Sequence, residues 1–431
     1  MWRTILALSS FATSAVAQSP ALVSALAANP DLSTLASALS LVTSFAGTLN
    51  TDEPITILAP TNSAFETLLA GGLNAESQAI IDQNPDGIET LLAYHVIRGT
   101  YVSTDFTEVP TYVNTRLNQS FSIFDTIRTN VTDGQNVGLL LNGDDATIIS
   151  GELQTSTVVQ ADIQVVPNIT IHKIDRVLTI PLNLSDTLVR LPQLSTSAAL
   201  GALDITGLLD RVDVGGESNQ LTLDTAEDIT VFIPNNAAFL AIGSLLQNAS
   251  NETLRSVLGY HAVAGSVVFA SDITNTTVES AEGSDLTLSV GTDGTVYVDN
   301  ARVVFPNILL SNGVAHIIDA VLNPDSDDID RDTLNPTATL APAFTGASFI
   351  GTNIPFTQSA ITPSTIISIP PLATTAKFVV PGGANATVTG GATGTGSRTV
   401  SATGPPIFTG GASKVGGGLG AAMGLGMAML L

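Results

Sequence analysis

The chain has 431 residues and a formal net charge of −24, from 14 basic and 38 acidic side chains. So negative a surface repels phosphate backbones and anionic lipids, which excludes nucleic-acid binding and electrostatic attachment to a membrane. The sequence has no cysteine, so disulfides, thiolate metal sites and cysteine nucleophiles are excluded as well. The length suits two domains of ordinary size, and the 5% aromatic content predicts aliphatic cores.

Residues 1–17 have the pattern of a secretory signal peptide. Arg3 supplies a positive charge, an apolar run follows, and Ala15 and Ala17 form a small-residue cleavage site. A buried N-terminal helix is the alternative interpretation. We expect a signal peptide and a mature chain that begins near Gln18.

Helical and extended patterns alternate across residues 18–180. Apolar residues at helical spacing predict helices, and short apolar runs between turn residues predict strands. Thr61 or Asn62 is expected to cap the helix that follows the first strand. In chain order, these elements are a helix over 31–42, a strand over 55–58, a helix over 88–96, short strands from 113 to 166 and a closing strand over 169–178.

The same order returns after a short linker over residues 181–187. The expected elements of residues 188–323 are a helical segment over 194–209, a strand over 229–233, a helix over 254–261, short strands after 278 and a closing strand over 314–322.

Three sequence blocks occur twice in the same order, which indicates a duplicated folding unit. The matched pairs are ITILAPTNSAF (55–65) with ITVFIPNNAAF (229–239), LLAYHVIRG (91–99) with VLGYHAVAG (257–265), and NITIHKIDRVL (168–178) with NGVAHIIDAVL (312–322). All four histidines of the chain lie inside these blocks. The offset between copies falls along the chain, so the first copy carries extra residues, mostly between its second and third blocks.

These blocks resemble the fasciclin domain, and the resemblance covers roughly residues 20–323. It is carried by the strand with Pro-Thr/Asn-x-Ala-Phe, the Tyr-His pair and the closing His-x-Ile-Asp-x-Val-Leu. The resemblance implies an α+β fold with two tandem fasciclin-like domains, residues 18–180 and 188–323. Each would be a β-wedge or sandwich with packed helices, in a secreted, adhesion-type protein.

Residues 324–411 differ in composition from what precedes them. They are rich in Thr, Ser, Pro, Gly and Ala, and they bury too little apolar surface to offset the entropy of ordering. We expect a disordered, O-glycosylated stalk. The acidic run at 325–332 lacks the central Gly and the final Glu of a calcium loop, so we interpret it as a solvated linker.

The final segment, residues 412–431, is expected to be a glycosylphosphatidylinositol (GPI) attachment signal. It is apolar but short for a transmembrane helix, and small residues precede it. The candidate attachment residues are Gly410, Gly411, Ala412 and Ser413. The alternative keeps the tail as an anchor in an endomembrane, for example at the vacuole.

Acceptor sequons for N-glycosylation are frequent, and in a secreted chain most exposed sequons are usable. They lie at Asn118, Asn130, Asn168, Asn183, Asn248, Asn251, Asn275 and Asn385. Asn168 adjoins a core strand, which makes it the weakest of the eight.

The sequence predicts no catalytic, metal or cofactor residue. There is no G-x-S-x-G elbow, and the histidines occupy matched blocks without the spacing of a metal site. The acidic residues are scattered, so no carboxylate pair for glycoside hydrolysis is defined. We expect no enzymatic activity and no cofactor, with a small-ligand or enzymatic domain as the alternative.

The Tyr-His pairs have two interpretations. In the first, the tyrosine ring packs in the core and the imidazole bonds a backbone carbonyl at a helix–strand corner. In the second, suggested by the family resemblance, the pair and an Asp-Ile element contact a partner. The candidate partner-binding residues are Tyr94, His95, Asp162, Ile163, Tyr260 and His261. The second copy has Asn307 in place of the acidic residue, and we favour the structural interpretation.

The closing strands each carry a histidine and, three positions later, an aspartate. Alternation along a strand places His172 and Asp175, or His316 and Asp319, on opposite faces, so a direct His–Asp pair is not expected. A structural role is predicted for these histidines too.

Taken together, the sequence predicts a glycosylated, GPI-anchored adhesion protein on the outer face of the plasma membrane or in the cell wall. The expected partners are cell-surface, wall or matrix proteins or glycans, with weak self-association. Nucleic acid is not an expected partner, and contact with the membrane would be through the lipid anchor.

Overall fold

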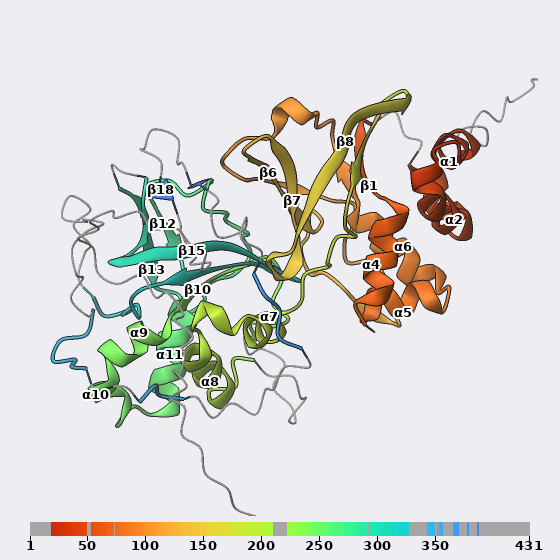
Figure 1. Ribbon diagram of the computed structural model, residues 1–431. Coiled ribbons are helices and arrows are strands. Elements are labelled where there is room, and N and C mark those ends of the chain that lie inside the picture. The colour runs from red at the N-terminus through yellow and green to blue at the C-terminus, as the bar shows by residue number, and fades with distance from the viewer. Residues whose placement is uncertain are drawn as a thin grey trace, which may run out of the picture.

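The computed structural model describes two domains that lie side by side (Figure 1). The described residues are 19–49, 53–72, 74–209, 222–291, 294–326, 343–349, 351, 353–356, 365–369, 377–378 and 386–387. The expected signal peptide, the sequon at Asn385 and the candidate anchor residues Gly410, Gly411, Ala412 and Ser413 lie outside them. Within the described residues, no helix is long and apolar enough to span a membrane.

In the first domain, most helices come early in the chain, interrupted by β1, and most strands follow after α6. Its elements are α1 (Ser19–Ala27), η1 (Pro30–Leu32), α2 (Ser33–Leu41), α3 (Thr43–Thr48), β1 (Ile55–Pro60), α4 (Asn62–Ala70), α5 (Ala75–Ile81), α6 (Pro85–Tyr94), β2 (Val96–Arg98), η2 (Ser103–Asp105), β3 (Thr111–Asn114), β4 (Ser122–Ile123), β5 (Thr126–Ile127), β6 (Asn136–Asn142), β7 (Asp145–Ile149), η3 (Gly151–Leu153), β8 (Thr155–Val166) and β9 (Ile169–Ile174).

The second domain repeats this order. Its elements are α7 (Leu184–Arg190), η4 (Pro192–Leu194), α8 (Ser197–Ile205), β10 (Ile229–Pro234), α9 (Asn236–Ala241), α10 (Gly243–Leu246), α11 (Asn251–Tyr260), β11 (Ala262–Val263), β12 (Thr276–Glu279), β13 (Asp285–Val290), β14 (Val296–Val298), β15 (Ala301–Leu310) and β16 (Gly313–Ile318). The short strands β17 (Lys377–Phe378) and β18 (Ala386–Thr387) follow.

The two main sheets have the same topology. The order is β2-β1-β9-β8-β7-β6-β3 in the first domain and β11-β10-β16-β15-β14-β13-β12 in the second. In both, the first strand pairs in parallel with the closing strand, and the other pairs are antiparallel. A bridge between Ile97 and Thr115 joins β2 to the chain after β3, so the first sheet nearly closes into a barrel.

The parallel pair lies at the centre of each core. All residues of β1, β9, β10 and β16 are buried, as expected for parallel strands that are covered on both faces. The surrounding cores are mostly aliphatic, as the composition predicts. Helices cover one side of each sheet (Figure 1).

The helix before the first Tyr-His pair differs from its expected range of 88–96. It begins at Pro85, where the Asn84 side chain caps its first turn, and it ends at Tyr94. Val96 belongs instead to β2, which pairs with β1. The cap followed by proline at the first helical position was visible in the sequence and marks the true start.

An aromatic stack joins the two domains. The rings of Tyr112 on β3 and Phe269 are stacked, with centroids 4.2 Å apart and 3° between the ring planes. Phe269 forms a small apolar cluster with Leu309 and Val314, against which Tyr112 packs. The first domain therefore covers an apolar surface of the second.

One backbone–backbone hydrogen bond and two bonds between backbone and side-chain groups accompany this stack. We refer to the stack and the bonds together as the domain interface. They join Thr132 to Asp228 (2.9 Å), Asn130 to Ser311 (2.8 Å) and Gln135 to Leu310 (3.0 Å). Directional bonds of this kind fix the relative orientation of the domains, because each would leave a polar group unpaired if the domains rotated apart.

The first domain also contributes η3 to the interface. Leu153 belongs to the core cluster of the second domain, and the Glu152 carboxylate pairs with Arg190 of α7 at 2.9 Å. Burial raises the pKa of Glu152 to about 7, and Arg190 opposes this rise. Through Leu153, the hydrophobic core of the second domain therefore extends into the domain interface.

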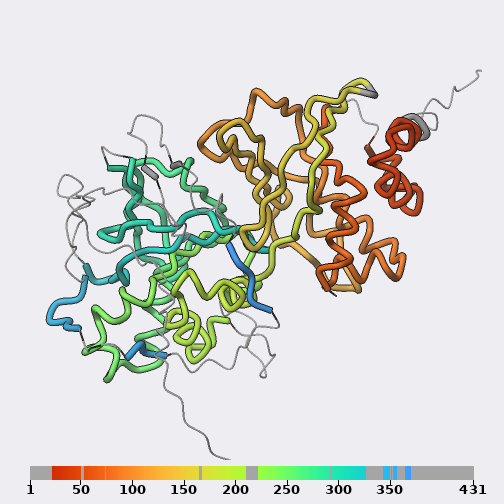
Figure 2. Tube along the Cα trace, viewed as in Figure 1, coloured from red at the N-terminus to blue at the C-terminus, as the bar shows by residue number. Residues whose placement is uncertain are grey.

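Part of the expected stalk lies against the second domain. Phe356 meets Phe239 of α9 edge-on with ring centroids 6.3 Å apart, and Ile367 and Ile369 pack against the second core. In Figure 2 this part of the chain, drawn in blue, lies near the green helices of that domain. A free stalk from residue 324 onward is therefore not what the structure shows for these residues, because their few apolar side chains meet a complementary surface.

Replacing Tyr112 with alanine should uncouple the domains. The variant loses the stack on Phe269, at a cost on the order of 2 kcal/mol. Differential scanning calorimetry should then show two unfolding transitions where the unsubstituted protein shows one. Tyr112→Phe keeps the ring and should retain the single transition; an unchanged profile for Tyr112→Ala would contradict the role given to the stack.

Candidate functional site: the Tyr-His corners and the closing histidines

The first Tyr-His pair holds a helix–strand corner together from inside. Nδ1 of His95 donates to the carbonyl of Leu91 at 2.8 Å, and Nε2 accepts the N–H of Leu178 at 2.9 Å. The Tyr94 hydroxyl donates to the carbonyl of Asn136, at the start of β6, at 3.0 Å. The pair thereby ties the end of α6 to the segment after β9 and to the start of β6.

The second pair makes the same contacts. Nδ1 of His261 donates to the carbonyl of Val257 at 2.7 Å, and Nε2 accepts the N–H of Leu322 at 2.9 Å. The Tyr260 hydroxyl lies 2.8 Å from the carbonyl oxygen of Asp285, at the start of β13. The histidine bonds of the two copies therefore correspond atom for atom, whereas the Tyr260 hydroxyl has an additional partner, the Asp299 carboxylate at 2.8 Å.

The closing histidines bridge a different pair of segments. Nε2 of His172 donates to the carbonyl of Tyr101 at 2.9 Å, while Nδ1 accepts the N–H of Asp162 at 3.3 Å. In the second domain Nε2 of His316 donates to the carbonyl of Val268 at 3.0 Å. Its Nδ1 accepts the N–H of Asn307 at 3.3 Å. Neither ring bonds the aspartate three residues later, in line with the strand alternation.

Each histidine therefore uses one ring nitrogen as a donor and the other as an acceptor, which requires the neutral imidazole. Burial lowers the pKa of His95, His261 and His316 to about 4 in each case, although the bond each makes to a carbonyl opposes the shift. No ring nitrogen is left to bind a metal or to move a proton.

The Tyr-His residues are not available to a partner. Tyr94 is 0% exposed, and His95, Tyr260 and His261 are 2–3% exposed. The interpretation of these four residues as a contact patch is thereby corrected, because their side chains are used up inside the fold. The structural interpretation fits their geometry.

Asp162 and Ile163 lie at a bulge of β8, and only the aspartate is well exposed. Asp162 has a left-handed backbone (φ 58°), and its carboxylate accepts the N–H of Ser103 at 2.9 Å. Burial alone would raise the pKa of this carboxyl group, but the bonds from the Ser103 hydroxyl and N–H lower it below its usual value. Asp162 therefore presents a fixed negative charge at the surface.

Asn307 is the counterpart of Asp162 in the second domain. It has the same left-handed backbone (φ 61°), and its side chain accepts the N–H of Ala270 at 2.8 Å. Unlike Asp162 it is buried, 2% exposed, and Tyr112 of the first domain bonds to it. The surface that is open in the first domain is thus covered by the domain interface in the second.

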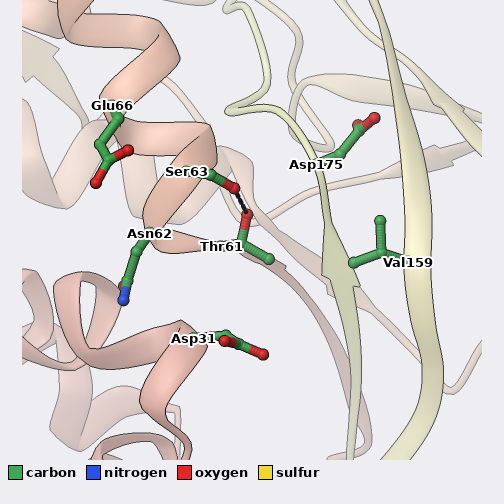
Figure 3. A pocket seen from close by; sticks show the side chains of 7 residues that line it. All are labelled: Asp31, Thr61, Asn62, Ser63, Glu66, Val159 and Asp175. Carbon is green, nitrogen blue, oxygen red and sulfur yellow. Dashed lines mark hydrogen bonds between the residues drawn. The ribbon is translucent and has the colours of Figure 1, made fainter.

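An open hollow of about 460 Å³ lies where α4 begins (Figure 3). Its lining consists of Asp31, Thr61, Asn62, Ser63, Glu66, Val159 and Asp175. Asp31 pairs with Lys173 at 3.1 Å, and Asp175 accepts the N–H of Thr157 at 2.7 Å, so two of the three carboxylates serve the fold. Among the described residues, no group of three or more histidine, aspartate or glutamate side chains is placed to hold a metal ion.

The block residues Thr56 and Asn62 proved more important than the sequence suggested. The Thr56 hydroxyl donates to the carbonyl of Gly99, and Asn62 accepts the N–H of Thr34 in α2. Thr230 and Asn236 make the equivalent bonds in the second domain. Identity at the same position of both copies was the signal that would have found them. Thr61, as expected, caps α4.

The sequons differ in how their asparagines are used. The side-chain nitrogen of Asn130 donates to the carbonyl of Thr225 at 3.0 Å, inside the domain interface. Because this nitrogen is the one that carries a glycan, glycosylation there would compete with the interface. Asn168, Asn248, Asn251 and Asn275 are exposed.

The fold and these contacts define a tandem repeat of an α+β module whose histidines fix the backbone. The chain matches the Fasciclin domain family over residues 30–181 and 203–324, and it belongs to that family. This confirms the resemblance and the fold class of two tandem fasciclin-like domains.

The curated relatives include fungal proteins. A "Fasciclin-like arabinogalactan protein" of Arthroderma benhamiae is 31% identical over 344 residues, covering 79% of this chain and 75% of that protein. "Fasciclin-like arabinogalactan protein elcF" of Phaeosphaeria nodorum is 29% identical, covering 71% and 91%. A solved FAS1 domain pair from the insect cell adhesion molecule Fasciclin I aligns with 71% of this chain and 98% of its own, at 18% identity and a TM-score of 0.29.

The buried histidines predict acid sensitivity. Their folded pKa of about 4 lies below the ordinary 6.5, so their contribution to stability is complete above pH 6.5 and is lost as the pH falls toward 4. Each of the three histidines should lower the free energy of unfolding by on the order of 1 kcal/mol for each pH unit in that window. Urea unfolding at a series of pH values checks this.

A matched variant isolates one histidine. His316→Asn should make the pH dependence shallower by about one third, since it removes one of three similar sites. The imidazole proton signals of the unsubstituted protein provide a second measurement. Signals of His95, His261 and His316 that titrate near pH 6.5 would contradict the buried neutral form.

Proposed function

We propose that this chain is a cell-surface adhesion protein that presents its two fasciclin domains to wall or matrix proteins or glycans. Membership of the fasciclin family and the fungal relatives named as fasciclin-like arabinogalactan proteins support this class of function. The observation that carries it is the use of both ring nitrogens of every histidine in backbone hydrogen bonds. A fold built in this way offers surfaces for binding, and we propose no catalytic activity.

We place the partner contact on the first domain, at Asp162 and Ile163. Asp162 is exposed, its carboxylate is held in one orientation by Ser103, and its lowered pKa keeps it charged. A preorganised charge binds with less loss of side-chain entropy than a mobile one. Because Asn307 is buried at the domain interface, each chain would offer one such site rather than two.

Asp162→Asn tests this site without changing the fold. The amide can still accept the N–H of Ser103, as Asn307 does for Ala270. If the carboxylate contacts the partner, attachment of protein-coated beads to cells or wall fragments should weaken about tenfold, the usual cost of losing a charged hydrogen bond. Glu66→Gln, which removes an exposed charge from the hollow at α4, is the control and should bind normally. Equal attachment by Asp162→Asn and the unsubstituted protein would exclude this contact.

The chain would reach the outer face of the plasma membrane or the cell wall through a GPI anchor. The small residues Gly410 to Ser413 before an apolar tail support this attachment, and the Thr/Ser/Pro-rich composition supports an O-glycosylated stalk. N-glycans would occupy the accessible sequons, whereas Asn130 would stay unmodified when the domains are joined.

Enzymatic release distinguishes this anchor from a retained helix. A phosphatidylinositol-specific phospholipase should free the protein from intact cells, and a chain lacking residues 415–431 should be secreted without treatment. Imaging of the tagged protein provides the control for location. Signal at the vacuolar membrane that resists the enzyme would contradict the proposal and favour an endomembrane anchor.

A further inference from the structure

A segment that follows the second sheet lies against the helical side of the second domain. We call this segment the strap: the described residues 343–349, 351, 353–356 and 365–369. At its centre the strap backbone at Phe356 passes directly over Gly201 of α8. A Cβ atom at Gly201 would lie 1.6 Å from the carbonyl oxygen of Phe356, so only glycine admits the strap there.

Polar contacts hold the first part of the strap. The backbone N–H of Ser348 donates to the Ser244 hydroxyl of α10 at 2.9 Å, and the N–H of Ser244 donates to the carbonyl of Ser348 at 3.2 Å. The Asn323 side chain donates to the carbonyl of Ala343 at 3.0 Å. Phe344 and Ala347 pack against the core between these bonds.

The last part of the strap covers the end of α7. The N–H of Ile367 donates to the carbonyl of Arg190 at 2.9 Å, which satisfies a terminal carbonyl that has no partner within the helix. Gln193 donates to the carbonyl of Ile367 at 2.8 Å, and Arg190 donates to the Thr365 hydroxyl at 2.9 Å. Side chains alternate as in a strand: Ile367 and Ile369 face the core, while Ile366 is 67% exposed.

In the described part of the first domain, the corresponding helix position is not covered. Asn62 accepts the N–H of Thr34 as Asn236 accepts that of Ala198, so these positions correspond, and so do the residues three later, Ser37 and Gly201. Ser37 is exposed on α2, whereas Gly201 is buried under the strap. The substitution of glycine for serine is thus found in the copy whose helix is covered.

We propose that the strap is an integral part of the second domain and that the face of α8 at Gly201 is its dedicated binding surface. The second domain then extends to residue 369 and does not end at residue 323. Because Arg190 contacts both the strap and Glu152 of the first domain, the strap also supports the domain interface. A chain ending at residue 324 would expose an apolar face of the second core.

Gly201→Ala in the full chain tests the proposal by the sign of its effect. Alanine stabilises the interior of a helix relative to glycine. The variant should therefore have a higher melting temperature if the strap does not lie on α8. If the strap is seated, the added methyl group displaces it. The melting temperature should then fall, and hydrogen exchange of the Ile367 N–H should become faster by about tenfold or more. Ser37→Ala is the matched control and should leave both measurements nearly unchanged.

A second variant separates strap release from damage to α8. Phe356→Ala leaves the helix intact but removes the ring from Phe239, so chymotrypsin should cut at Phe344 and Phe349 faster than in the unsubstituted chain. The rate for Phe356→Ala should approach that for Gly201→Ala. A higher melting temperature for Gly201→Ala with unchanged exchange at Ile367, or equal cleavage of all variants, would overturn the proposal.

Discussion

The structure depends on buried neutral imidazoles that join backbone segments far apart in the sequence. His95 accepts a hydrogen bond from the amide of Leu178, which is 83 residues away. His172 donates one to the carbonyl of Tyr101, which is 71 residues away. A neutral histidine suits this work because it has a donor and an acceptor on opposite sides of one rigid ring. Burial keeps the imidazole neutral. A buried backbone N–H or C=O left without the ring as its partner would destabilise the fold by more than the hydrogen bond stabilises it. Chemistry that needs a free imidazole is incompatible with this use.

Duplication preserved these contacts and changed the surfaces around them. Asp162 and Asn307 share a backbone conformation and a capping role, yet one is open to solvent and the other lies under Tyr112. Ser37 and Gly201 share a helical position, yet only the glycine is covered by the strap. Since the internal hydrogen bonds fix the module, single substitutions on its surface are enough to assign different neighbours to the two copies.

Most of the module was predictable because the residues that make its internal contacts occur in both copies of the repeat. The paired blocks gave the central strands, the cap at Thr61 and a structural use for the histidines. The domain interface was not predictable, since Tyr112 and Phe269 are lone aromatic residues outside every block and without a period. The strap was missed for a different reason. Its apolar residues Phe356, Ile367 and Ile369 lie in a segment whose Thr/Ser/Pro/Gly-rich composition predicts disorder, and the place of Phe356 depends on Gly201, more than 150 residues away.

These two unpredicted contacts change how adhesion by this chain should be understood. Two domains on a flexible tether would gain avidity by binding independently. Here the interface through Tyr112 joins them, and Asn307 is unavailable, so one chain presents one orientation of one open face. Strong attachment would then require many copies on the same surface rather than two sites on one chain. A strap seated up to residue 369 favours that arrangement, because it would hold the pair closer to the proposed anchor and restrict the directions in which Asp162 can face.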